Sequence, residues 1–342
     1  MRNDKKSVTL IAKLLRETSS LAIVSEFLKE KGLLHSASSW DEMISKRLLP
    51  AIRSKDIVIQ DLIELLRNVE EYGHQHVFLY RCAQPDAATI MGLERVYSII
   101  RKCGLGELID APKVLDQPQS PEISDIRWEH VLPEKSQFII KIIETRETSE
   151  LLSEESKGDI LTKRWRVKKE RAVNLFKLHA DGLLELRIKS QSNSTKYKSK
   201  VDQMWQLVAD FLPNDSFQEI SLDKVKERLG RDQELLKDKI RFSDVTLKND
   251  AGNTIKAVTG SCDSNLYEDN GIKSSVNGFI GHNNAYYDSH NIWFKIINGS
   301  DQDKQREIHV LLSGDINEFA ITAHCSSQEY EYVYDQLRNF NK

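Results

Sequence analysis

The 342-residue chain contains no long hydrophobic run. A membrane-spanning helix needs about 18 to 20 consecutive apolar residues, whereas the apolar stretch from Val8 to Leu15 is short and is interrupted by Lys13. The net charge of −3 excludes a highly basic, histone-like chain and a chain that its charge keeps disordered. We therefore expect a soluble intracellular protein, in the cytoplasm, nucleoid or nucleus, without a membrane partner.

Cysteine is also scarce. Cys82, Cys103, Cys262 and Cys325 lie far apart and form no CxxC pair, which suits a reducing compartment and excludes a disulfide framework or a cysteine-based zinc site. The sequence has no P-loop, no GxGxxG after a strand, no GxSxG and no HExxH. The absence of these motifs favours a non-enzymatic protein with no cofactor.

Hydrophobic spacing predicts an α+β protein with several domains. Four of the seven prolines fall between Pro112 and Pro133, which marks a linker. We expect an N-terminal, mostly helical domain over 1–111 and the Pro-rich linker over 112–135. We further expect a basic antiparallel β-domain with flanking helices over 136–230. The last predicted domain is an acidic, β-rich α+β domain over 231–342.

Capping signals locate several helices. Apolar residues at helical spacing predict four helices in residues 1–72, with Ser39 and Glu42 forming a capping box and Asp56 capping the last helix. Ser326 and Glu329 form a second capping box before the C-terminal helix.

Runs of β-branched and aromatic residues predict the strands. The sequence indicates strands at 76–80, 138–143, 161–176 and 183–189, with Asp181-Gly182 as the turn before the last. Residues 86–102 are expected to be one helix. Residues 250–290, rich in Gly, Asn, Ser and Asp, are expected to be mostly loops.

The small net charge hides a strongly uneven distribution. Residues 160–200 carry +9, whereas residues 81–159 carry −5 and residues 201–342 carry −8. Such a basic block attracts a polyanion to one surface, while the acidic flanks repel it. A second, weaker cluster of basic residues lies at the N-terminus and consists of Arg2, Lys5, Lys6, Lys13 and Arg16.

Within the basic block, charge alternates with apolar residues. A strand at 161–176 places Arg164, Arg166 and Lys168 on one face, and Leu161, Trp165 and Val167 on the other, where we expect Trp165 in the core. Alternate residues on a strand are about 6.6 to 6.8 Å apart, close to the spacing of phosphates along a nucleic-acid strand. The predicted contacts to a nucleic-acid backbone, DNA above all, are Lys163, Arg164, Arg166, Lys168, Lys169, Arg171, Arg187, Lys189, Lys196 and Lys198.

The leading hypothesis is a non-enzymatic DNA-binding and assembly adaptor that also contacts protein partners. One alternative is a metal-dependent hydrolase or nuclease, of the kind used in phage defence, at His74 and His76 or at His282, Asp288 and His290. Another is a scaffold whose basic strand docks an acidic protein. Since neither histidine group matches a motif with a known mechanism, we predict neither catalytic residues nor a metal site.

The order of these pieces resembles the centromere protein N family. The resemblance rests on a helical segment from Ser7 to Tyr72, the His74-Gln75-His76 segment, a helix from Leu93 to Lys102, a basic β-region from Lys163 to Lys189, a helix from Val201 to Phe211 and the helix start Ser221-Leu222-Asp223. It implies a helical domain and a β-domain that together contact nucleosomal DNA and a partner protein, without catalysis. The basic residues at 163–171 and at the N-terminus would then be the DNA contacts. The polar C-terminal β-region departs from the family pattern.

Overall fold

The computed structural model describes residues 2–130, 136–191, 197–297 and 305–342. They group into two compact units, each assembled from separate parts of the chain. The first unit comprises Met1–Glu71, Ile100–Trp128 and Ile139–Leu175, and the second comprises Tyr72–Ile99, Glu129–Phe138 and Phe176–Lys342. This grouping differs from the predicted consecutive domains, because two long strands each have residues in both units.

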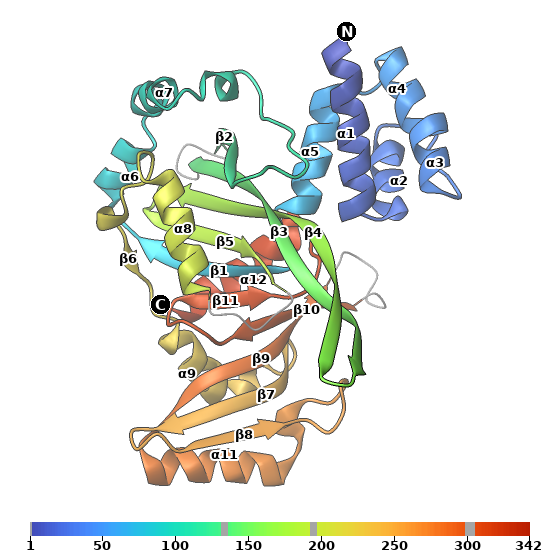
Figure 1. Ribbon diagram of the computed structural model, residues 1–342. Helices are drawn as coiled ribbons and strands as arrows, with labels where there is room; N and C mark the ends of the chain where they lie inside the picture. The colour runs from blue at the N-terminus through green and yellow to red at the C-terminus, as the bar shows by residue number, and fades with distance from the viewer. Residues whose placement is uncertain (1, 131–135, 192–196, 298–304) are drawn as a thin grey trace. The chain divides into compact units, whose positions relative to one another are not determined.

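A helical bundle opens the first unit (Figure 1, blue). Its elements are α1 (Arg2–Thr18), α2 (Leu21–Glu30), α3 (Trp40–Glu42), a π-helical segment (Met43–Leu48), α4 (Leu49–Ser54) and α5 (Ile59–Glu70). The predicted third helix is therefore α3 to α4, with a π turn inside it. Leu14, Val24, Leu28 and Leu62 belong to the apolar core of the bundle.

The helix starts in the bundle differ in part from prediction. Ser39 accepts a hydrogen bond from the Glu42 backbone at 3.2 Å, but the Glu42 carboxylate accepts from Ser38 and not from Ser39. Asp56 does not cap α5. Asp61 takes that role, since its carboxylate accepts from the Val58 backbone at 2.7 Å.

The remaining part of the first unit is mainly β-structure. The strands β2 (Glu122–His130), β3 (Ser136–Lys157) and β4 (Ile160–His179) lie side by side in that order. A short 3-10 helix (Gly106–Ile109) precedes them. Strand β3 is much longer than the predicted 138–143, because it continues as a strand through residues of high polarity, whereas β4 exceeds the predicted 161–176 by only four residues.

In the second unit the strand order is β5-β1-β11-β10-β9-β7-β8, and β6 also pairs with β1. The bounds are β5 (Leu183–Lys189), β1 (Gln75–Arg81), β11 (Glu318–Ile321), β10 (Gln305–Leu312), β9 (Ala285–Ile297), β7 (Ile240–Asn249), β8 (Thr254–Val258) and β6 (Gln218–Glu219). Neighbouring strands in this order pair antiparallel, with Val77 opposite both Arg187 and Phe319. The predicted turn before β5 is confirmed. Gly182 there has a φ of +85°, and an added Cβ would meet the Cys82 carbonyl.

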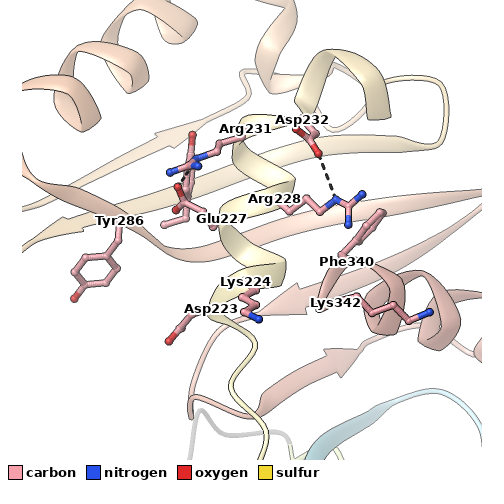
Figure 2. Close-up of a pocket in the computed structure, with 10 residues that line it drawn as sticks. Asp223, Lys224, Glu227, Arg228, Arg231, Asp232, Tyr286, Phe340 and Lys342 are labelled. Atoms are coloured by element: carbon pink, nitrogen blue, oxygen red, sulfur yellow. Dashed lines mark hydrogen bonds and ion pairs between the residues drawn. The ribbon is translucent and has the colours of Figure 1, made fainter.

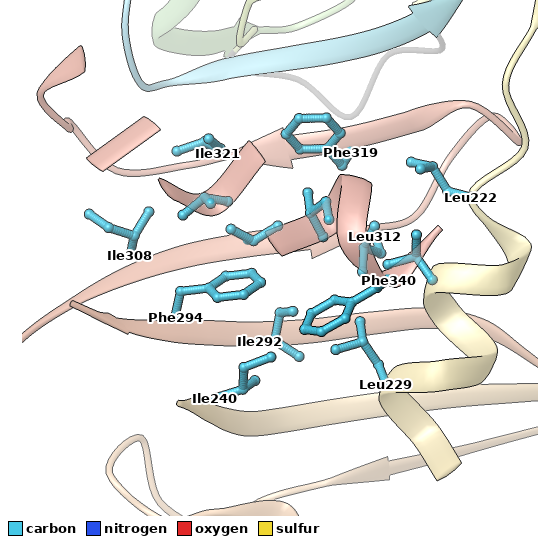
Figure 3. Close-up of a cluster of buried hydrophobic side chains, with 14 of the residues drawn as sticks. Leu222, Leu229, Ile240, Ile292, Phe294, Ile308, Leu312, Phe319, Ile321 and Phe340 are labelled. Atoms are coloured by element: carbon cyan, nitrogen blue, oxygen red, sulfur yellow. The ribbon is translucent and has the colours of Figure 1, made fainter. Parts of the chain in front are cut away.

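Several helices of the second unit pack against its sheet. The remaining helices of the chain are α6 (Gln84–Ile90), α7 (Leu93–Lys102, whose last three residues belong to the first unit), α8 (Lys198–Val208), α9 (Asp223–Arg231), α10 (Gln233–Leu236), α11 (Asn270–Asn283) and α12 (Ser327–Phe340). Figure 3 shows Ile292 and Phe294 of β9 beside Leu229 of α9 and Phe340 of α12, within one buried cluster. Trp205 of α8 contacts the Tyr80 ring, and alternate residues of β1 belong to the cluster shared with α12. Strand β1 is therefore covered on both faces.

These elements confirm the predicted α+β class. The predictions for individual helices and loops are confirmed in part. Ser326 and Glu329 form the predicted capping box of α12. The predicted helix over 86–102 is interrupted at Gly92 between α6 and α7. The expectation of loops over 250–290 is wrong, because β8 and α11 lie there. Among the described helices, none has the length and apolar character needed to cross a membrane.

Candidate nucleic-acid interface

The predicted basic strand lies in a long exposed hairpin, which we call the β-arm (residues 147–170). It consists of the outer parts of β3 and β4, joined by a tight turn at Gly158-Asp159 (Figure 1, green). Gly158 has a φ of +60°, which glycine adopts without steric cost. The inner part of β3 is buried and rich in isoleucine, whereas the β-arm is polar and exposed.

Three cations form what we call the basic face of the β-arm: Arg164, Arg166 and Lys168. All three are exposed, and the alternation of a strand places them on one side of β4. Within the described parts of the chain, no carboxylate forms an ion pair with any of them. They are therefore positioned to meet an external anion.

The two other lysines that β4 contributes to the arm are paired within the hairpin. Lys163 lies 3.0 Å from Glu154, and Lys169 lies 2.9 Å from Glu147. All four side chains are about half exposed, so these are surface ion pairs of small energy. The glutamates come from β3, whose outer part shows no apolar alternation and was not predicted to be a strand.

Trp165 does not lie in the core, so that prediction is wrong. Its side chain is 55% exposed, and Leu161 and Val167 on the same face of β4 are exposed to a similar degree. The alternation of apolar and charged residues along β4 is correct. The error was to assume that a second layer covers the apolar side of the β-arm.

Arg171 is a buried structural residue, not part of an exposed surface. Its side chain is 7% exposed, forms a salt bridge with Glu70 at the end of α5, and donates to the Leu115 carbonyl at 2.7 Å. Lys141 on β3 lies 3.1 Å from the same Glu70 carboxylate. Arg171 therefore binds the β-sheet to the helical bundle within the first unit.

Arg187 is also buried, which contradicts its predicted place on the basic surface. It lies 1% exposed on β5, 2.8 Å from Glu185, with its guanidinium 3.8 Å from the centre of the Tyr330 ring. Burial alone would raise the pKa of Glu185, but the charge of Arg187 and the hydrogen bond from His179 outweigh it and hold that pKa well below its usual range. The pair is charged and internal to the second unit.

The remaining predicted contacts are dispersed. Lys189 is half-buried at the end of β5, and Lys198 is exposed at the start of α8. Lys196 lies outside the described residues. At the N-terminus, Lys13 and Arg16 pair with Asp116 and Asp41, while the side chains of Arg2, Lys5 and Lys6 lie outside the described part.

His74 and His76 do not face the same side of a strand. His74 precedes β1 with a φ of +49°, and its ring meets the edge of the His324 ring with centroids 4.4 Å apart. Burial lowers the pKa of His74 to about 4, with a smaller contribution from His324. His76 instead contacts the Glu318 carboxylate and stacks on Tyr197.

His282, Asp288 and His290 have separate surroundings. His282 is exposed on α11, Asp288 pairs with Lys248 at 2.9 Å, and His290 is buried, with Nε2 donating to the Lys226 carbonyl at 2.8 Å. Burial lowers the pKa of His290 to about 4, so this imidazole is neutral at physiological pH. In the described ranges, no three His, Cys, Asp or Glu side chains form a group suited to a metal ion.

Figure 2 shows a pocket around α9 in the second unit. The volume of this pocket is about 860 Å³. Its charged residues largely neutralise one another, since Arg231 lies 2.6 Å from Glu227 and Arg228 lies 3.4 Å from Asp232. Arg228 also lies over the Phe340 ring. The pocket therefore offers less unpaired charge than the β-arm.

No protein-family model matches the chain, and no curated protein matches it. Function must therefore be argued from the residues of the site.

Proposed function

We propose that the protein is a non-enzymatic adaptor that binds the phosphate backbone of nucleic acid, DNA above all, through the basic face of the β-arm. The observation that carries the proposal is the row of Arg164, Arg166 and Lys168, exposed on one side of β4 and unpaired by any described carboxylate. Successive members are about 6.6 to 6.8 Å apart on a regular strand, which suits contacts to successive phosphates. The resemblance of the sequence layout to the centromere protein N family would imply the same role.

Burial and internal ion pairing reduce the number of cations that we expect to contact phosphates. Sequence alone offered ten candidate cations, of which about six in contact with phosphates would give a log–log salt slope of about −5 on duplex DNA. Because Arg171 and Arg187 are buried and two lysines of the arm are paired, we now expect about three contacts and a slope of about −3.

The test measures binding of a labelled DNA duplex by fluorescence anisotropy across a salt series. The variant Arg164→Glu, Arg166→Glu, Lys168→Glu should bind DNA at least roughly tenfold more weakly at low salt. The slope of the logarithm of its binding constant against the logarithm of the salt concentration should be about three less negative than that of the wild type. Since these side chains are exposed, the fold should be unaffected, which circular dichroism checks.

A matched control changes the same residue types elsewhere. Arg53, Arg101 and Lys239 are exposed and have no ion-pair partner among the described residues. Their combined change to Glu alters the net charge equally but should leave most of the affinity and the slope intact. Equal losses of DNA affinity in both variants would show that only the overall charge matters and would overturn the proposal. Wild-type DNA affinity in the variant of the basic face would overturn it as well.

A further inference from the structure

The side of the β-arm opposite the basic face carries a group of exposed apolar side chains together with the Lys163 to Glu154 ion pair. Leu161, Trp165 and Val167 lie there on β4, and regular pairing around the Lys163 to Glu154 contact places Leu152 of β3 on the same side. Each of the four is about half exposed. A group of exposed apolar side chains on a protruding hairpin is typical of an interaction surface. We call these four residues the apolar face.

The two strands of the β-arm carry opposite charge. On the side that carries the apolar face, alternation along the strands places Glu150 and Glu154 on β3, and Lys163 and Lys169 on β4. This surface has one acidic edge and one basic edge. It is complementary to a second copy of itself when the acidic edge of each copy meets the basic edge of the other.

We propose that the apolar face docks against the apolar face of a second copy of this chain, with the two arms parallel about a two-fold axis that runs along them. Rotation about that axis exchanges left and right, so β4 of one copy lies over β3 of the other. An antiparallel arrangement, with the axis across the arms, would instead place acidic strand on acidic strand and basic strand on basic strand. Charge therefore selects the parallel dimer.

The Lys163 to Glu154 pair fits this arrangement. The two residues lie across the hairpin from each other at the same distance from the turn, 3.0 Å apart. Rotation about an axis along the arm leaves the distance of each residue from the turn unchanged, so Lys163 of one copy faces Glu154 of the other. Two ion pairs thus form an alternating group of four charges beside the apolar contact.

The small area predicts a weak dimer. An outer strand of eleven residues is about 37 Å long and two strands are about 10 Å wide, so face-to-face contact buries about 700 to 800 Å² in total. This lies below the roughly 1,200 Å² of a standard stable interface, and we expect association in the micromolar range. Both basic faces would point outward, so the dimer could hold two nucleic-acid segments.

The first experiment follows the molar mass of the full, nuclease-treated protein by sedimentation across a concentration series. The wild type should pass from monomer to dimer, and Leu161→Ser with Trp165→Ser should remain monomeric over that range. The matched control is Leu151→Ser with Ile160→Ser, which removes two exposed apolar residues from the opposite side of the same arm and should leave the dimer intact.

The second experiment tests the orientation. Asp159→Cys, with the exposed Cys103 and Cys262 changed to Ser, places a thiol at the tip of the arm. Parallel arms bring the two tips together, so a short bismaleimide should cross-link the dimer efficiently. In an antiparallel dimer the tips lie about 37 Å apart, and cross-linking should fail.

The dimer proposal and the proposed function can fail separately, because they use opposite sides of the arm. A wild type that stays monomeric at all concentrations overturns the dimer, as does a dimer that survives the Leu161 and Trp165 changes or fails to cross-link at its tips. If those two changes weaken DNA binding in a monomeric protein, the apolar face belongs to the nucleic-acid site instead. None of these results depends on the charge-reversal variant of the basic face.

Discussion

Arg166 and Arg171 lie five residues apart on the same strand and have opposite roles. Arg166 is exposed on the β-arm without a described carboxylate partner, whereas Arg171 is buried against Glu70 and the Leu115 carbonyl. The difference follows from what covers each part of β4. Where a second layer excludes water, a charge is tolerated only with partners, and where the hairpin is exposed on both sides, a cation needs none.

A count of charges therefore mixes two populations. The +9 block at 160–200 contains the free cations of the basic face together with Arg171 and Arg187, which are already neutralised by buried glutamates. Only the free cations can bind an external anion without breaking an internal contact. Removal of a buried one should instead destabilise the fold, because it leaves a buried carboxylate without its counter-charge.

The largest expected effect comes from removing a buried cation. Arg187→Ala leaves the carboxylate of Glu185 without its main counter-charge in a site that is 0% exposed. We expect a loss of about 3 to 5 kcal/mol in the free energy of unfolding, the usual result of breaking a buried ion pair. Urea denaturation followed by fluorescence measures it.

The control for that loss is the same substitution on the basic face. Arg166→Ala should change the free energy of unfolding by no more than about 0.5 kcal/mol, because the residue is exposed and no described carboxylate pairs with it. Equal losses for the two variants would break the distinction between buried and free cations.

A second test uses pH on the buried network of the first unit. Burial alone would raise the pKa of Glu71, but the charges of Lys141 and Arg127 outweigh it and bring the pKa to about 2 from an ordinary value of 4.5. A folded-state pKa below the unfolded one means that the stabilisation is complete above the ordinary pKa and is lost as the pH falls from about 5 toward 2. This corresponds to about 3 kcal/mol at neutral pH.

The variant Glu71→Gln isolates this contribution, since glutamine does not titrate. The free energy of unfolding of the wild type should exceed that of the variant by about 3 kcal/mol at pH 7, and the gap should narrow steadily below about pH 5. A gap that stays constant with pH would show that Glu71 acts through packing or hydrogen bonding and not through its charge.

The sequence predicted those features that depend on local pattern. The capping box at Ser326 and Glu329 follows from neighbouring residues, as does the Gly182 turn. The alternation of Arg164, Arg166 and Lys168 likewise needs only the period of a strand.

Features that depend on what covers a strand could not be read in this way. Trp165 and Arg187 each occupy the expected side of a strand, yet one is exposed and the other is buried. The outer part of β3 lacks apolar alternation and becomes a strand by pairing with β4, which no local signal reveals. Residues 270–283 form α11 despite their Gly and Asn content. The sequence pattern therefore identified the candidate cations. Only their burial in the structure distinguishes the exposed cations, which can contact an external anion, from the buried ones.

The smallest expected effect completes the comparison between buried and exposed ions. Lys163 and Glu154 form a 3.0 Å ion pair, as close as many buried pairs, but their side chains are 42% and 44% exposed. A double-mutant cycle with Lys163→Ala and Glu154→Ala, measured by urea denaturation at concentrations where the chain is monomeric, should give a coupling energy of about 0.2 to 1 kcal/mol. Added salt should reduce it further, since solvent-exposed charges are screened. A coupling above about 2 kcal/mol that resists salt would contradict the rule that burial, and not contact distance, decides which ion pairs of this protein stabilise it.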